Sequence, residues 1–354
     1  MDTIDTSAPV LVTGATGYVA GWLVKALLDA GATVHAAVRD PDNAEKLAHL
    51  TRLAANAPGA IRFFKADLLE EGSFAEAMAG CKLVFHTASP FTTRIKDPQK
   101  DLVDPALNGT RNVLEEANRR DSVERVVVTS SCAAIYGDNA DLADAPGGVL
   151  TEEIWNTSSS LEHMAYSYSK TVAERAAWEI AGAQERWRLV AVNPSFVLGP
   201  ALQPRPTSES FTLVKGFGDG TFKTGAPRIG IGTVDVRDLA EAHMRAGFLP
   251  EAEGRHIISN EETDFLGLAE ALRDAYGDDY PLPKGPIPKW LAWLVGPMLN
   301  PLTTRKYIVR NVDIEWRADN SKSVEKLGMR YRPLKATMED MFAFMIEAGV
   351  FTAR

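Results

Sequence analysis

Residues 10–21, VLVTGATGYVAG, join an apolar strand to a glycine turn, and a helix-forming segment starts at Trp22. This strand–turn–helix context makes a glycine pattern typical of dinucleotide binding. Gly14 permits the tight turn, Gly17 lets the backbone approach a pyrophosphate, and Ala20 allows the helix to pack closely on the strand. Phosphates bind at such a helix N-terminus, where unpaired N–H groups and the dipole favour anions. An ordinary buried strand and turn is the alternative. The predicted cofactor contacts of the turn are Gly14, Thr16, Gly17, Tyr18 and Val19.

The composition is that of a globular protein and excludes several classes of partner. The chain has 354 residues, of which 45% are hydrophobic and 24% charged. A net charge of −9 argues against a nucleic-acid partner or a polybasic contact with a membrane. Cys81 and Cys132 are too few for a disulfide framework, and the six histidines show no ligand spacing, so we predict no metal. No basic region precedes an apolar stretch at the N-terminus, so a cytoplasmic protein is expected.

Strand-like and helix-like segments alternate through the first 195 residues. The strand-like runs are Val10–Thr13, Thr33–Val38, Ile61–Lys65, Leu83–Thr87, Arg125–Ser130 and Arg188–Val192. The helical segments are Trp22–Ala30, Ala44–Ala55, Phe74–Ala79, Leu102–Arg119 and Ala165–Gly182. Continuous apolar runs are typical of strands buried on both faces. The alternation therefore predicts an α/β fold with a doubly wound parallel sheet, the Rossmann arrangement.

Beyond Pro194 the composition changes, with prolines around a short helix at Ser208–Gly216. A strand at Val234–Asp238, a helix at Ala240–Phe248 and a strand at Arg255–Ser259 are then expected. We predict a dinucleotide-binding domain of residues 1–194, rejoined by 232–260. Residues 195–231 and 261–354 are expected to form a smaller, discontinuous C-terminal substrate-binding lobe.

One apolar segment, residues 287–302, is interrupted by prolines and a lysine. It is shorter than the ~20 residues that span a bilayer. We expect it to pack in the C-terminal lobe and predict no membrane partner. An interfacial or subunit-contact helix is the alternative.

The residues after the second strand indicate which nicotinamide dinucleotide binds. A carboxylate at the end of this strand favours a free ribose 2′-hydroxyl and repels a 2′-phosphate. Here Arg39 comes first, with a planar fork suited to phosphate, and Lys46 follows. The pattern predicts NADPH/NADP+, although Asp40 could turn inward, or Arg39 could be a solvated surface residue. Asp67 and Leu68 follow the third strand, where a carboxylate can meet the adenine amino group.

The second decisive feature is Tyr166-Ser-Tyr-Ser-Lys170, at the start of an Ala- and Glu-rich helix. A spacing of four places the phenol and the ammonium on one helical face. An unperturbed tyrosine has a pKa of about 10, and a nearby lysine cation lowers it. The strand before this helix ends in Thr129-Ser130-Ser131, and a serine there can donate a hydrogen bond to a substrate oxygen.

Together these motifs resemble the extended short-chain dehydrogenase/reductases over nearly the whole chain. The segments that carry the resemblance are TGATGYVA, VRDP, ADL, FHTASPF, NGTRNVL, VVTSSCAAIYG, YSYSK, NPSFVLGP and VDVRDLAEAH. Within that family, AYSYSKTVAERAAWE and the VRDP arginine are most similar to the dihydroflavonol reductase, cinnamoyl-CoA reductase and fungal aldehyde/ketone reductase branch.

The resemblance implies Tyr166 as general acid, Lys170 as partner of the phenol and the nicotinamide ribose, and Ser131 as the group that polarises the carbonyl. In the nucleotide-sugar branch the catalytic hydroxyl falls at the position of Cys132, which departs from that pattern. Ser131 is therefore preferred and Ser130 is the fallback. The family pattern also places Pro194 and Val197 against the nicotinamide, and Thr87 and Ala88 near the adjoining ribose. Substrate contacts are expected from Ser89, Phe91, Ser131, Ile135, Tyr166 and Phe196, together with the Ser208–Leu213 helix. Phe91 and Phe196 could instead be core residues.

The sequence thus predicts an NADPH-dependent ketone/aldehyde reductase, or reversible alcohol dehydrogenase, that acts on a small-molecule carbonyl or alcohol as a monomer or homodimer. A nucleotide-sugar epimerase or dehydratase and a hydroxysteroid dehydrogenase are alternatives from the same family. A dinucleotide sensor without catalytic activity is a third reading, although such a protein would be expected to have lost Tyr166 or Lys170.

Overall fold

The computed structural model describes residues 4–89, 95–204, 206–299 and 303–351. The strands are β1 (Val10–Thr13), β2 (Thr33–Val38), β3 (Ala60–Lys65), β4 (Leu83–His86), β5 (Arg125–Thr129), β6 (Arg188–Pro194), β7 (Phe196–Leu198), β8 (Gly230–Asp235), β9 (Gly254–Ile258) and β10 (Glu262–Asp264). The helices are α1 (Tyr18–Asp29), α2 (Ala44–Ala55), α3 (Ala75–Met78), α4 (Asp104–Asn118), α5 (Ala165–Gly182), α6 (Glu209–Gly218), α7 (Val236–Phe248), α8 (Phe265–Glu270), α9 (Arg273–Tyr276), α10 (Lys289–Leu299), α11 (Arg305–Asn311), α12 (Ser321–Lys326) and α13 (Leu334–Glu347). Short π and 3-10 turns cover Gln99–Val103, Cys132–Ala134, Asn139–Asp144 and Pro146–Gly148.

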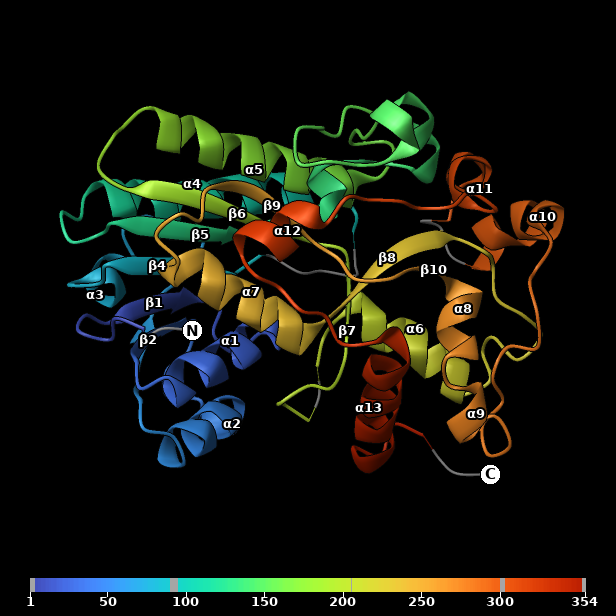
Figure 1. Ribbon diagram of the computed structural model, residues 1–354, viewed down its shortest axis with the longest axis horizontal. Helices are drawn as coiled ribbons and strands as arrows, with labels where there is room; N and C mark the ends of the chain where they lie inside the picture. Colours follow the sequence, from blue (N-terminus) through green and yellow to red (C-terminus); the bar gives the residue numbers. More distant parts are fainter. Residues whose placement is uncertain (1–3, 90–94, 205, 300–302, 352–354) are drawn as a thin grey trace.

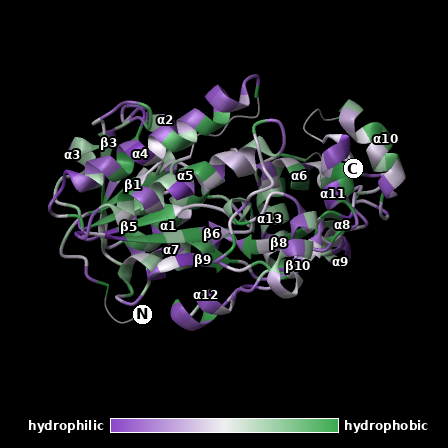
Figure 2. Cartoon of the chain, turned by 90° about the horizontal axis from the view of Figure 1, so that it is seen from above, coloured by the Kyte–Doolittle hydropathy of each residue, from purple (hydrophilic) through white to green (hydrophobic). Residues whose placement is uncertain are grey.

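A parallel sheet with the strand order β3-β2-β1-β4-β5-β6-β9 forms the larger part of the molecule. Helices α1, α2 and α7 share one hydrophobic cluster on one face, and α3, α4 and α5 share another on the opposite face (Figure 1). The strands between these layers are mostly hydrophobic (Figure 2). Strands covered on both faces bury nearly every side chain, which is why their sequences read as continuous apolar runs. The prediction of a doubly wound sheet is confirmed.

The order of strands reverses between β1 and β4, because β2 pairs with one edge of β1 and β4 with the other. In open α/β sheets ligands bind at the carboxyl ends of the strands on either side of such a reversal. The segments that follow these strands begin with Gly14 after β1 and Thr87 after β4. This part of the fold therefore locates the candidate site.

A second, small sheet has the strand order β10-β8-β7, and its hydrophobic side chains share a core cluster with helices α6, α8 and α13. The strand expected at 234–238 is wrong in its limits: β8 ends at Asp235, whose side chain caps α7 by accepting the Arg237 N–H at 2.8 Å. Because β8 pairs with β7 and β10, it belongs to the small sheet, whereas α7 packs on α1 and β9 joins the large sheet. The division into domains at residue 194 stays a prediction. In the part of the chain that the structure describes, no helix has both the length and the apolarity to cross a membrane.

Candidate active site

The glycine turn has the geometry that a dinucleotide needs. Gly14 has φ +64, and a Cβ there would lie 2.9 Å from the Cα of Ala88, so only glycine fits without strain. Gly17 is the N-cap of α1, and no side chain of the described residues caps this helix. Its first N–H groups therefore point at the end of the sheet, ready to bind an anion. These residues fit a pyrophosphate.

The side chain of Tyr18 faces away from this anion site. Its phenol donates a hydrogen bond to the carbonyl oxygen of Gly199 at 2.7 Å, and Trp22 donates to Pro200 at 2.8 Å. Tyr18 and the partly buried Val19 pack against hydrophobic neighbours, so they can meet a phosphate only through their backbone. Both contacts hold α1 to the strand–loop segment that leads into the C-terminal lobe.

The segment after β4 links the glycine turn to α5. Thr87 donates to the Thr13 carbonyl at 2.5 Å, and the Ala88 N–H donates to the Thr13 hydroxyl at 3.1 Å. The Lys170 ammonium then donates to the Ser89 hydroxyl at 3.2 Å. Ser89, expected as a substrate contact, is thus the partner of Lys170 in this structure. These hydrogen bonds link the glycine turn, through the segment after β4, to Lys170 of the YSYSK motif.

Tyr166 and Lys170 lie on one face of α5, as their spacing predicts. The ammonium is 5.9 Å from the centroid of the Tyr166 ring. Met164, which precedes the helix, adopts a left-handed conformation with φ 56, an arrangement that is costly for a non-glycine residue. His163 anchors this strained entry, because its Nε2 lies 2.7 Å from the buried carboxylate of Asp138.

The environment raises the pKa of Tyr166 to about 12, which differs from the expected lowering. Surrounding protein atoms desolvate the phenolate, and the Glu209 carboxylate at the start of α6 repels it, although the side chain keeps 49% of its surface exposed. Burial also lowers the pKa of Lys170 to about 8. The ammonium is directed at Ser89, and among the described residues no hydrogen bond joins it to the phenol. At neutral pH the phenol therefore keeps its proton.

The two serines after β5 have different surroundings. Ser130 is buried, and its hydroxyl donates to Glu174. Ser131 is only partly buried, and its Oγ accepts the Ala133 N–H at 3.1 Å, which leaves its own proton available. These contacts favour Ser131 as the hydroxyl that faces a substrate.

Glu174 is the centre of a buried network that the sequence analysis missed. Its carboxylate forms an ion pair with Arg255 of β9 at 2.6 Å and accepts a hydrogen bond from Asn193 at 2.8 Å. The Arg255 guanidinium lies 4.0 Å from the centroid of the Trp155 ring, which ties the loop that contains Trp155 to the sheet. The one available signal was the spacing of four between Lys170 and Glu174, which places both on the same face of α5.

Arg39 and Lys46 are exposed at the carboxyl end of β2 and the start of α2. The Asp40 carboxylate accepts the Asp42 N–H at 3.2 Å, so it is occupied within its own turn and does not pair with Arg39. The Asp67 carboxylate likewise accepts the Leu69 N–H at 2.9 Å, and Leu68 packs beside Gly109. Arg39 and Lys46 are exposed and have no ion-pair partner among the described residues, so both side chains can bind a phosphate group.

Only some of the residues that were expected to line the substrate pocket lie where they can do so. Ile135 is 1% exposed and belongs to a hydrophobic core cluster with Cys132 and Trp316, so it forms no wall. Phe196 is partly buried beside Phe265, with ring centroids 6.4 Å apart. Pro194 is the last residue of β6, at the carboxyl end of the large sheet, and Val197 lies in β7, which follows it directly in the chain. Phe91 lies outside the described residues.

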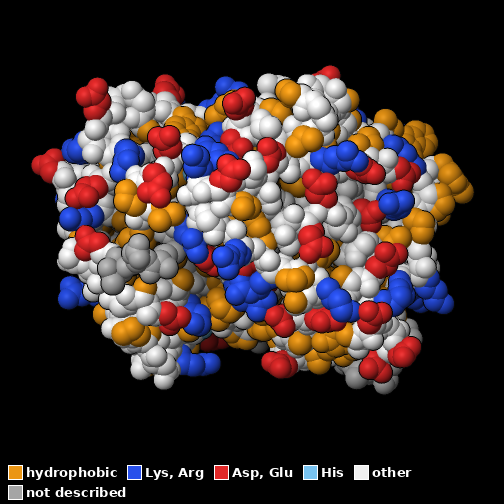
Figure 3. Space-filling model, in the orientation of Figure 1, with side chains coloured by type: hydrophobic (Ala, Val, Ile, Leu, Met, Phe, Trp, Pro, Cys, Tyr) orange, Lys and Arg blue, Asp and Glu red, His pale blue; other side chains and the backbone are white. Residues whose placement is uncertain are grey.

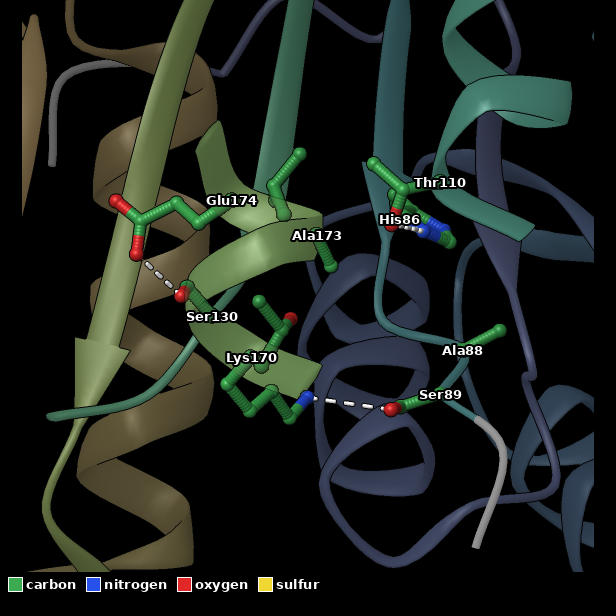
Figure 4. A pocket seen from close by; sticks show the side chains of 10 residues that line it. His86, Ala88, Ser89, Thr110, Ser130, Lys170, Ala173 and Glu174 are labelled. Atoms are coloured by element: carbon green, nitrogen blue, oxygen red, sulfur yellow. Dashed lines mark hydrogen bonds between the residues drawn. The ribbon is translucent and has the colours of Figure 1, made fainter. Parts of the chain in front are cut away.

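A cavity of about 20 Å³ lies behind Lys170 at the ends of β4 and β5 (Figure 4). The labelled side chains come from β4, α4, α5 and the segments that follow β4 and β5; they are His86, Thr110, Lys170, Ala173, Glu174, Ala88, Ser89 and Ser130. This volume is far too small for a dinucleotide or an organic substrate, so the cavity marks only the inner end of the site. Within the described ranges, no cluster of His, Cys, Asp and Glu is arranged to hold a metal ion.

Fold and site together define an α/β dinucleotide-binding enzyme, and comparisons with known proteins identify its family. The sequence matches the family described as "NAD dependent epimerase/dehydratase family" over residues 10–257. It is 36% identical over 346 residues to tetraketide alpha-pyrone reductase 1 of Arabidopsis thaliana, covering 96% of each chain. It is 42% identical over 272 residues to cinnamoyl-CoA reductase CAD2 of Medicago truncatula, covering 75% of this chain and 80% of that protein.

Solved structures show the same relationship. The yeast methylglyoxal/isovaleraldehyde reductase Gre2, complexed with NADPH, aligns with a TM-score of 0.75 at 28% identity, covering 97% of this chain and 100% of that one. Gre2 of Candida albicans, also with NADPH, has a TM-score of 0.75 at 27% identity, covering 96% and 99%. The chain belongs to the NAD dependent epimerase/dehydratase family, the extended short-chain dehydrogenase/reductases. The predicted family and the expected oxidoreductase class are confirmed.

Proposed function

We propose that this protein is an NADPH-dependent carbonyl reductase in which Tyr166 is the general acid, Lys170 its cationic partner and Ser131 a hydrogen-bond donor to the substrate oxygen. One observation carries the proposal. The turn at Gly14 packs on Ala88, Ser89 follows it, and the Ser89 hydroxyl accepts a hydrogen bond from Lys170 beside the Tyr166 ring. This arrangement brings a proton donor close to a dinucleotide turn.

The residues perform separate steps of a carbonyl reduction. When bound, the reduced nicotinamide supplies the hydride that the carbonyl carbon accepts. Tyr166 donates its phenolic proton to the carbonyl oxygen, and its raised pKa keeps that proton in place at neutral pH until the oxygen becomes basic. The Ser131 hydroxyl donates a hydrogen bond to the same oxygen and stabilises its developing charge. The positively charged ammonium of Lys170 stabilises the negative phenolate that forms when Tyr166 gives up its proton.

NADPH is the cofactor that these residues favour over NADH. Arg39 stands where a carboxylate would read a free ribose hydroxyl, and Asp40 is held in its own turn. The two Gre2 structures that contain NADPH support the same cofactor for this chain. The relatives are reductases of cinnamoyl-CoA and tetraketide pyrone compounds by name, so an organic carbonyl compound is the substrate class that we propose.

A matched pair of tyrosine variants tests this function. Tyr166→Phe removes only the proton donor, whereas Tyr168→Phe makes the same change two positions along α5. We expect Tyr166→Phe to lower kcat by about 100-fold or more, the range of general acid catalysis, with NADPH binding retained. Tyr168→Phe should stay close to the wild type.

The substrates in this assay separate the alternatives. NADPH oxidation is followed with aromatic aldehydes, β-keto esters, diketones and a sugar nucleotide. Turnover of the carbonyl compounds by the wild type supports the proposal. An epimerase or dehydratase returns its hydride to the substrate and consumes no NADPH, so the sugar nucleotide is also followed by chromatography. Conversion of the sugar nucleotide alone would make the protein an epimerase or dehydratase, and NADPH binding without any turnover would make it a sensor. Full activity of Tyr166→Phe would contradict the proposed role of the phenol.

A further inference from the structure

Helix α10 (Lys289–Leu299) is apolar on every side and yet contains no fully buried residue. It lies with α11 at the end of the molecule opposite the first strands of the large sheet (Figure 1). Apart from Lys289, its sequence KWLAWLVGPML has no charged residue. A helix that is hydrophobic all round is normally found inside a protein or a membrane. Its position at the surface therefore needs an explanation.

The outward face of α10 carries a continuous apolar stripe. Trp290, Trp293, Leu294 and Met298 follow the spacing of one helical face, and Trp290 and Met298 are 68% and 83% exposed. We call the exposed residues Trp290, Trp293, Leu294, Met298 and Leu299, with Val309 of α11, the α10–α11 patch. In Figure 3 hydrophobic side chains gather at the right-hand edge of the molecule, where α10 lies, so a flat surface can reach them.

The segment that forms the α10–α11 patch carries only positive charges of its own. Residues 280–312 contain five basic residues and no acidic one, in a chain whose net charge is −9. Two of the five are used internally: Lys289 donates to the Val309 and Val312 carbonyls, and Arg310 pairs with carboxylates of the 138–141 segment. The other three are exposed, and among the described residues none of them has an ion-pair partner; they are Lys284, Arg305 and Lys306. Arg305 lies 4.4 Å from the Trp293 ring.

We propose that the α10–α11 patch binds peripherally to the surface of an anionic phospholipid bilayer. Exposed tryptophans, an apolar helical stripe and flanking cations are the features of a helix that lies in the headgroup region and buries its apolar face about 5–10 Å deep. The segment 280–312 itself has no acidic residue, so Lys284, Arg305 and Lys306 can attract an anionic lipid surface to the patch. This proposal revises the sequence-based expectation that the protein has no membrane partner, and it is independent of the reaction catalysed.

A second copy of the chain fits the α10–α11 patch less well. A two-fold interface brings the same surface of both subunits together, which would gather the exposed Arg305 and Lys306 of both subunits in one interface. Repulsion between like charges opposes such a dimer. An anionic lipid surface supplies the complementary charge.

Sedimentation of the full-length protein with vesicles tests the proposal. The vesicles are made of phosphatidylcholine alone or of phosphatidylcholine with phosphatidylserine. We expect the bound fraction to be at least about tenfold higher with phosphatidylserine and to fall as salt is added, because each basic residue near an anionic surface contributes about fivefold to binding. Lys306→Gln should therefore weaken binding about fivefold.

The variant Leu294→Glu/Met298→Glu places charges on the exposed stripe and should abolish binding. Val324→Glu is the matched control, because Val324 is also exposed, at 43%, but lies on α12, outside the predicted cofactor and substrate contacts. All variants should keep the melting temperature and the turnover of the wild type, since every changed side chain is at the surface.

Three results would overturn the proposal: no sedimentation of the wild type with phosphatidylserine vesicles, equal binding to phosphatidylcholine alone, or equal loss of binding in Val324→Glu. A wild-type dimer that Leu294→Glu/Met298→Glu converts to a monomer, without vesicle binding by either, would identify a second copy as the occupant and also overturn it.

Discussion

Replacing Ser130 and Ser131 separately by alanine distinguishes a structural from a catalytic hydroxyl in adjacent residues. Ser130 is 5% exposed, and its hydroxyl donates to the buried Glu174 carboxylate. A hydrogen bond to a charged group contributes about 1.5–3 kcal/mol to stability. At roughly 2–4 °C for each kcal/mol, Ser130→Ala should lower Tm by about 5 °C and leave kcat within about threefold.

Ser131→Ala should have the opposite signature. Its Oγ accepts the Ala133 N–H at 3.1 Å at the start of one short turn, so the loss of stability is about 1 kcal/mol or less. Its proton, however, is the one available to a substrate oxygen. Removing one such donor lowers kcat by about 10²–10³-fold in enzymes that stabilise an oxyanion.

Each variant is measured in two assays, thermal unfolding and NADPH oxidation with a saturating aldehyde, and NADPH binding is checked by fluorescence. The reasoning is refuted if Ser130→Ala loses more than tenfold in kcat at an unchanged Tm while Ser131→Ala keeps its turnover. That result would make Ser130 the catalytic hydroxyl and would mean that Glu174 activates it.

Three further predictions follow from the site. Arg39→Ala should reduce the preference for NADPH over NADH by about ten- to a hundredfold in kcat/KM, the value of a charge-assisted bond, whereas Arg52→Ala on α2 should not; an unchanged ratio contradicts the assignment. Because the folded state holds the pKa of Lys170 at about 8 against an ordinary 10.5, the unfolded chain binds more protons between these values and stability rises with pH there. At neutral pH the Tm of Lys170→Met should therefore be higher than that of the wild type, and the difference in Tm should decrease from about pH 8 to about pH 10; a difference that does not change with pH argues against a buried ammonium. Glu174→Gln leaves the Arg255 guanidinium buried without its carboxylate, which should destabilise the protein by about 3–5 kcal/mol in denaturant unfolding, and a loss below 1 kcal/mol would show that the pair is not buried as described.

Elements with a strong local signal could be predicted from the sequence almost to the residue. The helices Ala44–Ala55 and Ala165–Gly182 have the expected limits, because their periodicity and termini are set by neighbouring residues. The start of α7 was misplaced, since the capping role of Asp235 depends on its side chain accepting the Arg237 N–H. The motif pairs Gly14–Gly17 and Tyr166–Lys170 were also found, because each lies within one turn.

Contacts between distant segments could not be read in this way. Nothing near Ser130 in the sequence shows that its hydroxyl binds Glu174, or that Ile135 is a core residue. The pKa of Tyr166 was expected to fall, because only its neighbour Lys170 was considered; in the fold Glu209 approaches from α6 and protein atoms desolvate the phenolate.

The doubly wound sheet, the dinucleotide turn and the tyrosine–lysine pair could be predicted from the residues alone, because periodicity, glycine conformation and helical spacing act over a few residues. Only the folded chain shows which serine hydroxyl is available, which charges surround the phenol and which face of α10 is exposed. Burial and electrostatic environment are set by residues that meet only after folding, and the apolar sequence of α10 would read the same in a core as on a surface.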